Sequence, residues 1–330
     1  MAYSVALIGL GGIGMGYDLK LPAQDHVLSH ARALALHPDF EIAGAVDPAP
    51  ELRETFSHAY GAMACASAAE LLQHAKVDVC IVASPTTTHL AVIEEILHHA
   101  TPQLILCEKP LAYGEGEAQR IVDLCRAHGV ALFVNYVRRA DPGVMEVRER
   151  IVRGDIAAPF KAVVWYSKGL LHNGSHFLDL MTFWFGPVAG WSIVAPGERC
   201  GEQDAEPDFR LEFSGGSAIF CAAKEENFSH YTVEVVAANG RLRYEQAGTI
   251  QWQAAGPHPT LENYRRLEAQ GAAIADDMNR YQYRVADQVS RALQGKPHSL
   301  CEGAAGAANI RLLHALLNAR TNTSHTSHQE

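Results

Sequence analysis

The sequence lacks an apolar run long enough to span a bilayer, and none of its cysteines has the C-x-x-C spacing of a metal or redox site. Its seven cysteines cannot all pair within the chain, so we expect buried or inert thiols in a reducing compartment. No charged segment of a signal peptide follows Met1, which favours a cytoplasmic protein. Basic residues are also few. The 27 Lys and Arg against 37 Asp and Glu give a net charge of -10, which disfavours nucleic acid or an anionic membrane as a partner.

The first part of the chain alternates short apolar runs with helical patterns. We predict strands at 5–8, 42–46, 77–83, 104–107 and 131–134, and helices at 31–37, 51–60, 68–74, after Pro85 and at 117–128. Strands that alternate with helices form right-handed βαβ units and a parallel sheet that is covered on both faces. The pattern therefore predicts an α/β fold, a doubly wound Rossmann domain over residues 1–135.

The rest of the chain has a different pattern. We predict strands at 160–167, 209–213, 217–223, 232–237 and 241–244, a hairpin turn at Asn239-Gly240, and helices at 276–293 and 304–319. Few helices intervene between these strands, so residues 136–320 are expected to form an α+β domain with a largely antiparallel open sheet. The polar residues 321–330 have no apolar face and are expected to be a disordered tail.

A glycine-rich motif directly follows the first predicted strand. Gly9, Gly11 and Gly14 form the pattern G-x-G-x-x-G, with Gly12 and Ile13 between the last two. Glycines at this point let backbone N–H groups approach a pyrophosphate, and the start of the following helix adds a favourable field. We therefore predict a dinucleotide site here. The alternative is a glycine-rich turn in another kind of α/β protein.

Asp47 ends the second predicted strand, where a carboxylate can accept hydrogen bonds from the adenosine ribose and repel a 2′-phosphate. This predicts NAD as the preferred cofactor, with NADP as the second choice; the alternative for Asp47 is a solvated carboxylate before Pro48. Asp47 follows Gly14 by well over the usual distance of about 20 residues. The surplus lies in residues 15–29, which we expect to form an extra loop that folds over the cofactor or the substrate.

Three motifs occur in order at the ends of predicted strands. They are the glycine motif, the sequence A-S-P-T-T-T-H from Ala83 to His89, and Glu108-Lys109-Pro110. In this combination the chain resembles the family of glucose-fructose oxidoreductase, inositol dehydrogenase and MocA (Gfo/Idh/MocA), as far as about Arg320. Glu-Lys-Pro at the end of the fifth strand is the most specific of the three motifs.

The resemblance implies that Lys109 lies at the nicotinamide end of the cofactor and exchanges a proton with the substrate hydroxyl. Burial beside a cofactor lowers the pKa of a lysine and suits it to this role, whereas without the family an exposed lysine would be the simplest interpretation. Pro110 would fix the turn, even in the cis form. The residues expected at the cofactor are Gly9, Gly11, Gly12, Ile13, Gly14, Asp47, Ser84, Pro85, Thr86, His89, Glu108 and Lys109. Taken alone, His89 would be an ordinary histidine at the start of a helix.

In the second domain, Gly174-Ser-His176-Phe-Leu-Asp179 is similar to the G-x-H-x-x-D segment of the family. The similarity implies that His176 holds the reacting oxygen and that Asp179, three residues on, orients its ring. The alternative for His176 is packing against aromatic neighbours. The family often has aspartate where this chain has His172, so His172 and Asn173 are expected to contact substrate hydroxyls or an amide.

Residues 135–142 are similar to the family's linker into the second domain, where Arg138 and Pro142 match its pattern. Arg138 is expected at the substrate, while Val137 stands where the family often has asparagine.

The resemblance implies reversible hydride transfer between nicotinamide C4 and a secondary carbinol of a sugar, a cyclitol or a nucleotide sugar. The substrate would lie between the Rossmann strand ends and the second sheet. The resemblance also implies a homodimer or homotetramer through the outer face of that sheet, and we expect no metal site. Two alternatives stay open: an NAD-dependent hydrolase or eliminase that uses transient oxidation, and a sensor that binds the dinucleotide without catalysis.

Overall fold

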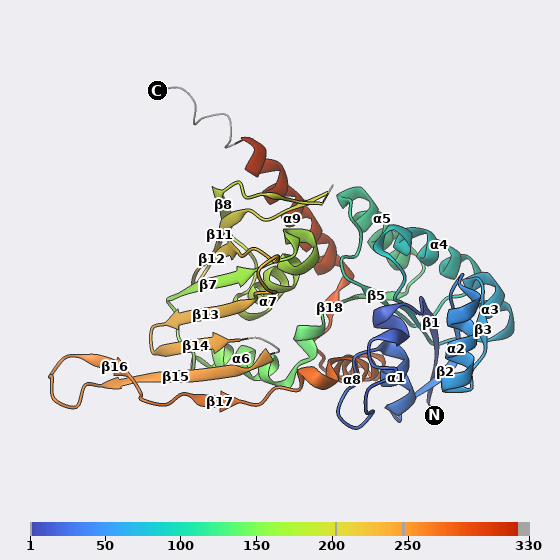
Figure 1. Cartoon of the computed structure of the whole chain (residues 1–330), viewed down its shortest axis with the longest axis horizontal. Coiled ribbons are helices and arrows are strands. Elements are labelled where there is room, and N and C mark those ends of the chain that lie inside the picture. The colour runs from blue at the N-terminus through green and yellow to red at the C-terminus, as the bar shows by residue number, and fades with distance from the viewer. Residues whose placement is uncertain (1, 202, 246–247, 323–330) are drawn as a thin grey trace. The chain divides into compact units, whose positions relative to one another are not determined.

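A computed structural model describes residues 2–201, 203–245 and 248–322 (Figure 1). The described chain divides into two compact units. The first unit contains the residues up to Ala140 together with Asn279–Ile310, and the second contains Asp141–Met278 and the residues from Arg311 onward. This division falls a few residues after the boundary expected at 135. Asn279–Ile310 returns to the first unit because helix α8 (Tyr281–Leu293) packs on helix α1 (His30–Leu36).

The first unit is built on a mostly parallel sheet, as predicted. Its strands are β1 (Tyr3–Ile8), β2 (Phe40–Val46), β3 (Ala64–Cys65), β4 (Val79–Val82), β5 (Leu104–Glu108), β6 (Ala131–Asn135) and β18 (Cys301–Glu302). The order across the sheet is β18-β6-β5-β4-β1-β2-β3, and only β18 of these described strands runs antiparallel to its neighbour. The strand order therefore reverses between β1 and β4, which is where a doubly wound sheet binds its ligand.

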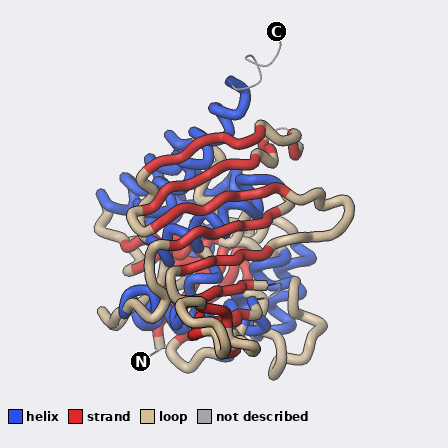
Figure 2. The backbone as a smooth tube through the Cα atoms, turned by 90° about the vertical axis from the view of Figure 1, so that its left-hand side faces the viewer, coloured by secondary structure: helices blue, strands red, loops and turns tan. Residues whose placement is uncertain are grey.

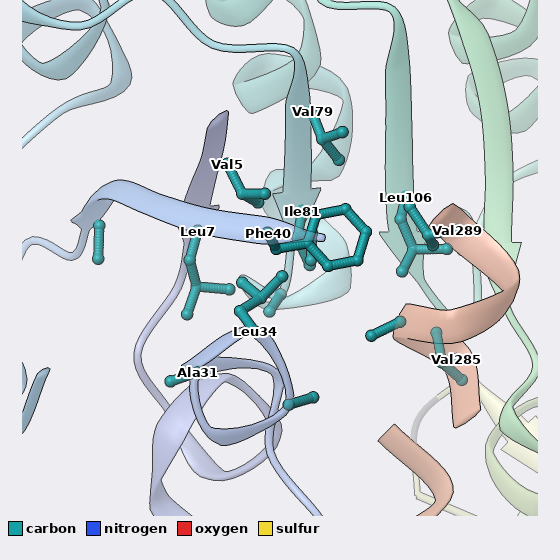
Figure 3. Packing of buried hydrophobic residues seen from close by; sticks show 14 of the residues in the cluster. Val5, Leu7, Ala31, Leu34, Phe40, Val79, Ile81, Leu106, Val285 and Val289 are labelled. Atoms are coloured by element: carbon teal, nitrogen blue, oxygen red, sulfur yellow. The ribbon is translucent and has the colours of Figure 1, made fainter. Parts of the chain in front are cut away.

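Helices cover this sheet because its strands are apolar on both faces. Besides α1 and α8 they are α2 (Pro50–Tyr60), α3 (Ala68–His74), α4 (His89–His99) and α5 (Glu115–Ala127). Figure 3 shows the core beneath α1 and α8, where Leu34 and Val289 meet Phe40, Ile81 and Leu106 of the sheet. Helix α8 begins at Tyr281 rather than at 276, after the short 3-10 turn Met278–Arg280.

The second unit contains a sheet in the order β16-β15-β14-β13-β7-β12-β11-β8, with β17 also paired to β15 (Figure 2). The strands are β7 (Phe160–Tyr166), β8 (Gly190–Ala195), β11 (Asp208–Phe213), β12 (Gly216–Ala222), β13 (Thr232–Ala237), β14 (Gly240–Tyr244), β15 (Ile250–Pro257), β16 (Arg265–Leu267) and β17 (Ala272–Ile274). Among these described strands only β7 and β12 pair in parallel, so the prediction of a largely antiparallel sheet is confirmed. A separate hairpin joins β9 (Arg199–Cys200) to β10 (Asp204–Ala205).

Helices α6 (Pro142–Arg153) and α7 (Ser175–Phe185) pack together, and Trp184 Nε1 donates a hydrogen bond to the carbonyl of Val144. Rings of α7 stack against inward-facing rings of the sheet, such as Phe185 on Phe160. Alternate residues of the sheet strands point the other way and stay exposed. Val163, Trp165, Ile219 and Val236 are among these exposed apolar residues.

Helix α9 (Gly303–Asn322) continues two residues into the expected tail, and residues 323–330 lie outside the described ranges. All seven cysteines are thiols rather than disulfides, and burial raises the pKa of Cys80 and Cys125 to about 12, as expected for inert thiols. None of the helices in the described ranges combines the length and the apolar character needed to cross a bilayer.

Candidate active site

The predicted cofactor residues of the first unit gather at one edge of its sheet. Parallel strands end on the same side, so the segments after β1, β2, β4 and β5 lie at a common edge. Gly9 follows β1, Asp47 follows β2, Ser84 lies just after β4 and Lys109 directly follows β5. The motifs that were far apart in the sequence are therefore brought to the edge where a dinucleotide binds in such folds.

The glycines of the motif have separate roles. Gly9 has a φ of 101°, and a Cβ on it would lie 2.5 Å from the backbone nitrogen of Ser84. A Cβ on Gly14 would lie 2.0 Å from the carbonyl oxygen of Gly9, so these two glycines allow the turn to close on itself. A Cβ on Gly11 would meet nothing within 4 Å. The backbone at Gly11 therefore faces open space, as a phosphate-binding turn requires.

The segment after the glycines differs from the expected α-helix. Gly12–Gly16 is a single π-helical turn, in which Gly16 N donates to the carbonyl of Gly11, and helix α1 begins only at His30. Ile13 packs its side chain against the apolar core. The favourable field predicted from the start of the following helix is thus reduced to that of one turn, because the predicted extra loop lies between this turn and α1.

The expected loop is present, and its base is firmly held. Asp18 is completely buried and accepts hydrogen bonds from the backbone N–H of Leu28 at 2.6 Å and from the backbone and hydroxyl of Ser29. Arg32 donates to the carbonyls of Leu21 and His26. Ser29 in turn caps the N-terminus of α1. These contacts close the loop on itself like an Ω-loop.

The tip of the loop contrasts with its base. Its residues from Lys20 to Asp25 are exposed. Tyr17 at the start of the loop is also exposed, and a Cβ on Gly12 would lie 2.5 Å from its ring. A folding of this tip over ligands stays a prediction.

Asp47 is buried at 8% exposure, so it is not the solvated carboxylate of the alternative interpretation. Its Oδ2 accepts from the N–H of Leu10 at 2.8 Å, and its Oδ1 accepts from the N–H of Ala49 at 2.9 Å. Arg53 donates to the carbonyl of Asp47. A carboxylate has about four acceptor sites, so these two bonds fix its position and leave capacity for a ligand.

The turn after β4 holds a histidine inside the protein. His89 is completely buried, and its ring nitrogens lie 3.0 Å from the carbonyl oxygens of Leu111 and Ser84. His89 therefore joins the turn after β4 to the segment after β5. Its two protein partners show that the ring supports this turn, and a contact of His89 with the cofactor stays a prediction. Ser84, Pro85 and Thr86 remain on the accessible side, with Thr88 Oγ1 bonded to Ser84 Oγ.

Lys109 lies directly after β5, and its peptide bond to Pro110 is cis. The pKa of Lys109 is lowered to about 8, chiefly by burial; the charge of Glu108 opposes this shift, and the charge of Arg138 adds to it. Arg138 itself is buried on the turn Val137–Ala140 of the first unit. A lysine in this state exchanges its proton close to neutral pH, which is what a general acid or base requires.

Glu108 points into the protein, where it is 9% exposed. Its Oε1 lies 2.8 Å from His30 Nε2 and 2.6 Å from Asn135 Nδ2, and Gln282 lies beside both partners. Burial alone would raise the pKa of Glu108, but these hydrogen bonds and the charge of Lys109 hold it below its usual value. Sequence reasoning missed His30, Asn135 and Gln282 as one cluster, because nothing local in the sequence connects positions so far apart.

The second unit presents its four predicted residues on one continuous segment. His172 and Asn173 lie on the π-helical turn Gly169–Gly174, where His172 is exposed and Asn173 half-buried. His176 and Asp179 lie on α7, and Asp179 is 1% exposed. The spacing of three residues places His176 and Asp179 on the same side of the helix, as predicted.

Two carboxylates that sequence reasoning did not place hold this turn. Asp204 accepts from the backbone N–H of Leu171 at 3.0 Å and of His172 at 3.2 Å. Glu206 accepts from the N–H of Gly169 at 3.0 Å. The hairpin that carries them therefore fixes the backbone from which His172 and Asn173 project.

Residues 3–136 match a family described as an oxidoreductase family with an NAD-binding Rossmann fold, Gfo/Idh/MocA. The match covers the Rossmann segment of the chain. The resemblance inferred from the three motifs is thereby confirmed. Inositol 2-dehydrogenase of Burkholderia multivorans is 32% identical to this chain over 161 residues, which are 48% of this chain and 44% of that protein.

A second relative is a putative oxidoreductase subunit of UDP-kanosamine synthase from Amycolatopsis mediterranei. It is 29% identical over 212 residues, which are 59% of this chain and 55% of that protein. The chain thus spans about half the length of the curated relatives it matches.

Solved structures share the fold of this chain over almost its whole length. An oxidoreductase from Agrobacterium radiobacter, in complex with NAD+, L-tartaric acid and magnesium, is 17% identical with a TM-score of 0.76, covering 98% of this chain and 97% of that chain. The WlbA dehydrogenase from Bordetella pertussis, in complex with NADH and UDP-GlcNAcA, is 20% identical with a TM-score of 0.76, covering 98% and 96%. These likenesses confirm the predicted fold of both sheets.

Proposed function

We propose that this protein is an NAD-dependent dehydrogenase or reductase that acts on a secondary hydroxyl or ketone of a sugar, a cyclitol or a nucleotide sugar. The observation that carries the proposal is Lys109, whose pKa is lowered to about 8 at the strand edge that also bears the open glycine turn. The names of the relatives, inositol 2-dehydrogenase among them, support a polyhydroxylated substrate.

The residues present fit a dinucleotide. The open backbone at Gly11 suits the pyrophosphate, and Asp47, fixed by Leu10 and Ala49, suits the hydroxyls of the adenosine ribose. A carboxylate there repels a 2′-phosphate, which favours NAD over NADP. When bound, the nicotinamide supplies the hydride acceptor or donor for the reaction.

Lys109 is the proposed catalytic residue. In the direction of oxidation its neutral amine accepts the hydroxyl proton of the substrate at Nζ, and in the direction of reduction its ammonium group returns a proton to the carbonyl oxygen. Burial and the charge of Arg138 keep the neutral amine accessible near pH 8. Without them the lysine would stay protonated at neutral pH and could act only as an acid.

The second unit is proposed to bind the substrate. His176 donates a hydrogen bond to the reacting oxygen, Asp179 orients its ring, and His172 and Asn173 bond neighbouring hydroxyls through neutral polar groups. Histidine in place of the aspartate common in the family removes one carboxylate, which leaves proton exchange to Lys109.

We also propose that the protein is a homodimer or homotetramer. The exposed side of the sheet carries Val163, Trp165, Ile219 and Val236 on neighbouring strands, between 39% and 54% exposed. Exposed apolar side chains gathered on one face of a sheet are typical of protein–protein interaction sites. A second copy of the chain is the occupant that the family resemblance supports.

Cofactor binding followed by a substrate screen tests the proposal. All four tryptophans belong to the second unit, so calorimetry is preferred to tryptophan fluorescence for NADH and NADPH. We expect NADH to bind more tightly than NADPH, and NAD to be reduced with at least one of myo-inositol, D-xylose or a UDP-sugar. Tight NADH binding without turnover on such a panel would point to a sensor. Product formation without net NADH would point to a hydrolase or eliminase.

A further inference from the structure

Four polar side chains form a buried cluster next to Lys109 that the proposed reaction does not use. Glu108 of β5 contributes a carboxylate, His30 of α1 an imidazole, and Asn135 of β6 and Gln282 of α8 their amides. Each of the four is less than a tenth exposed. Such groups are costly to bury, so their mutual arrangement calls for an explanation.

The hydrogen bonds of the cluster converge on one carboxylate. Glu108 Oε1 accepts hydrogen bonds from His30 Nε2 at 2.8 Å and from Asn135 Nδ2 at 2.6 Å. The other carboxylate oxygen, Oε2, accepts a hydrogen bond from the backbone N–H of Lys109 at 3.3 Å. Because a carboxylate only accepts, His30 Nε2 must carry a hydrogen. Gln282 completes the cluster, 3.4 Å from Asn135 and 3.3 Å from His30.

His30 is itself held in place from the other side. It is the first residue of α1, directly after the capping Ser29, whose hydroxyl and backbone are bound to the buried Asp18. The extra loop therefore ends on the residue that donates to Glu108. Its base keeps the imidazole in one position at the start of the helix.

The charge on Glu108 matters for Lys109 because the two residues are adjacent. Burial and Arg138 lower the pKa of Lys109, and the negative charge of Glu108 opposes them. The other ionisable groups that face Glu108 are Tyr281 of α8 and Cys107 of β5, and burial keeps both neutral by raising their pKa values. Glu108 and Arg138 are two charged neighbours that act on Lys109.

We propose that His30 is a positioning residue for proton exchange. By donating to Glu108 Oε1 it keeps that carboxylate charged and in place, and through the carboxylate it sets how readily Lys109 gives up its proton. The inference rests on the proposed role of Lys109, but it concerns a property that can be measured without any substrate.

The test follows the titration of Lys109 directly. Lysines are labelled by reductive ¹³C-methylation, their NMR signals are titrated with pH, and Lys109→Arg identifies the signal of Lys109. Glu108→Gln removes the charge and is expected to lower the pKa of Lys109 by about one unit or more. His30→Leu is expected to shift it in the same direction by a smaller amount, because Glu108 without its donor takes up a proton more readily. His30→Gln keeps an amide donor and should stay near the wild type.

A control variant and a double variant separate the proposed route from general damage. His37→Leu replaces another buried histidine seven residues further along, just after the same helix, and should leave the titration unchanged. In the Glu108→Gln background, His30→Leu should add no further shift, because the carboxylate through which it acts is gone. NADH binding and the melting temperature show that each variant is folded. If His30→Leu does not fold, His30→Asn, whose amide is too short to reach Glu108, takes its place.

Three results would overturn the inference. They are an unchanged Lys109 titration in His30→Leu, an equal shift in His30→Leu and His30→Gln, or a further shift from His30→Leu in the Glu108→Gln background. Failure of the proposed function is a different result. In that case Lys109 titrates as described in all variants, but the wild-type protein turns over no substrate.

Discussion

Asp47 accepts a hydrogen bond from the backbone N–H of Leu10 at 2.8 Å, which ties the end of β2 to the turn after β1. The residue proposed to recognise the ribose is thereby fixed to the turn proposed to bind the phosphates. A ligand that contacts both meets a preorganised surface and has less side-chain entropy to remove on binding.

Replacing Asp47 with Asn tests this arrangement. The change removes the charge but keeps one acceptor, so we expect NADH binding to weaken about tenfold, or ~1.4 kcal/mol. Binding of NADPH should change less, because repulsion of its 2′-phosphate is lost, and the preference for NADH should shrink. Calorimetry with both cofactors measures the two affinities.

Asp78→Asn is the matched control for this variant. Asp78 also accepts a backbone N–H, from Ser4 at 3.0 Å, but it lies before β4 at the opposite end of the strands. Its replacement should leave both affinities unchanged. An unaltered ratio of NADH to NADPH affinity in Asp47→Asn would remove Asp47 from cofactor selection.

The pH dependence of the rate follows from the lowered pKa of Lys109, about 8. Oxidation needs the neutral amine, so its rate should fall as the pH drops below this value. Reduction needs the ammonium form, so its rate should fall as the pH rises above it. With rising pH, kcat/KM should therefore increase for oxidation and decrease for reduction around this pKa. A change in the same direction for both reactions would contradict the role of Lys109.

Replacing Arg138 tests the same pH dependence in a second way. The positive charge of Arg138 lowers the pKa of Lys109, so Arg138→Gln should move the pH dependence of oxidation and of reduction to higher pH. A movement to lower pH would mean that the charge of Arg138 does not act on Lys109 in the working enzyme.

The base of the extra loop should contribute strongly to stability. Asp18→Ala leaves the N–H groups of Leu28 and Ser29 without their acceptor, and we expect it to lower the free energy of unfolding by about 2–4 kcal/mol. Asp25→Ala, in the exposed part of the same loop, should have no such effect. Urea unfolding measures both, and equal stabilities would show that the loop is not anchored through Asp18.

The exposed face of the second sheet predicts the oligomeric state. Ile219→Lys places a charge among Val163, Trp165 and Val236 and should convert the assembly to monomers in analytical ultracentrifugation. Val152→Lys changes an exposed apolar residue on α6 and should leave the assembly intact. A wild-type protein that sediments as a monomer would contradict the proposal that this face binds a second copy of the chain.

The sequence predicted those parts of the fold that depend on local patterns. The apolar runs at 42–46 and 104–107 became β2 and β5 because a buried parallel strand is apolar on both faces. Helix α6 was not predicted, although Asp141 caps it and Gly154 ends it. Strands β15, β16 and β17 were missed because they are partly exposed and carry many polar residues.

Within the candidate site, the sequence predicted the motifs that face the ligand but not the residues that hold these motifs in place. The glycines, Asp47 and Lys109 could be named because each has a recognised place at the end of a strand. The supports could not be named, since His30 and Gln282 are separated by most of the chain and meet only when α1 packs on α8. Asp204 likewise supports the turn of His172 from a hairpin that has no pattern of its own.

The measurement closest to the central claim compares wild type with Lys109→Met, first for NADH binding by calorimetry and then for NAD reduction on the substrate that the screen identifies. We predict that the variant binds NADH within a few-fold of wild type but loses about 10²–10⁴-fold in kcat, the usual contribution of a general acid or base. Turnover by Lys109→Met at the wild-type rate would contradict the account, because the group that carries the proton would then lie elsewhere.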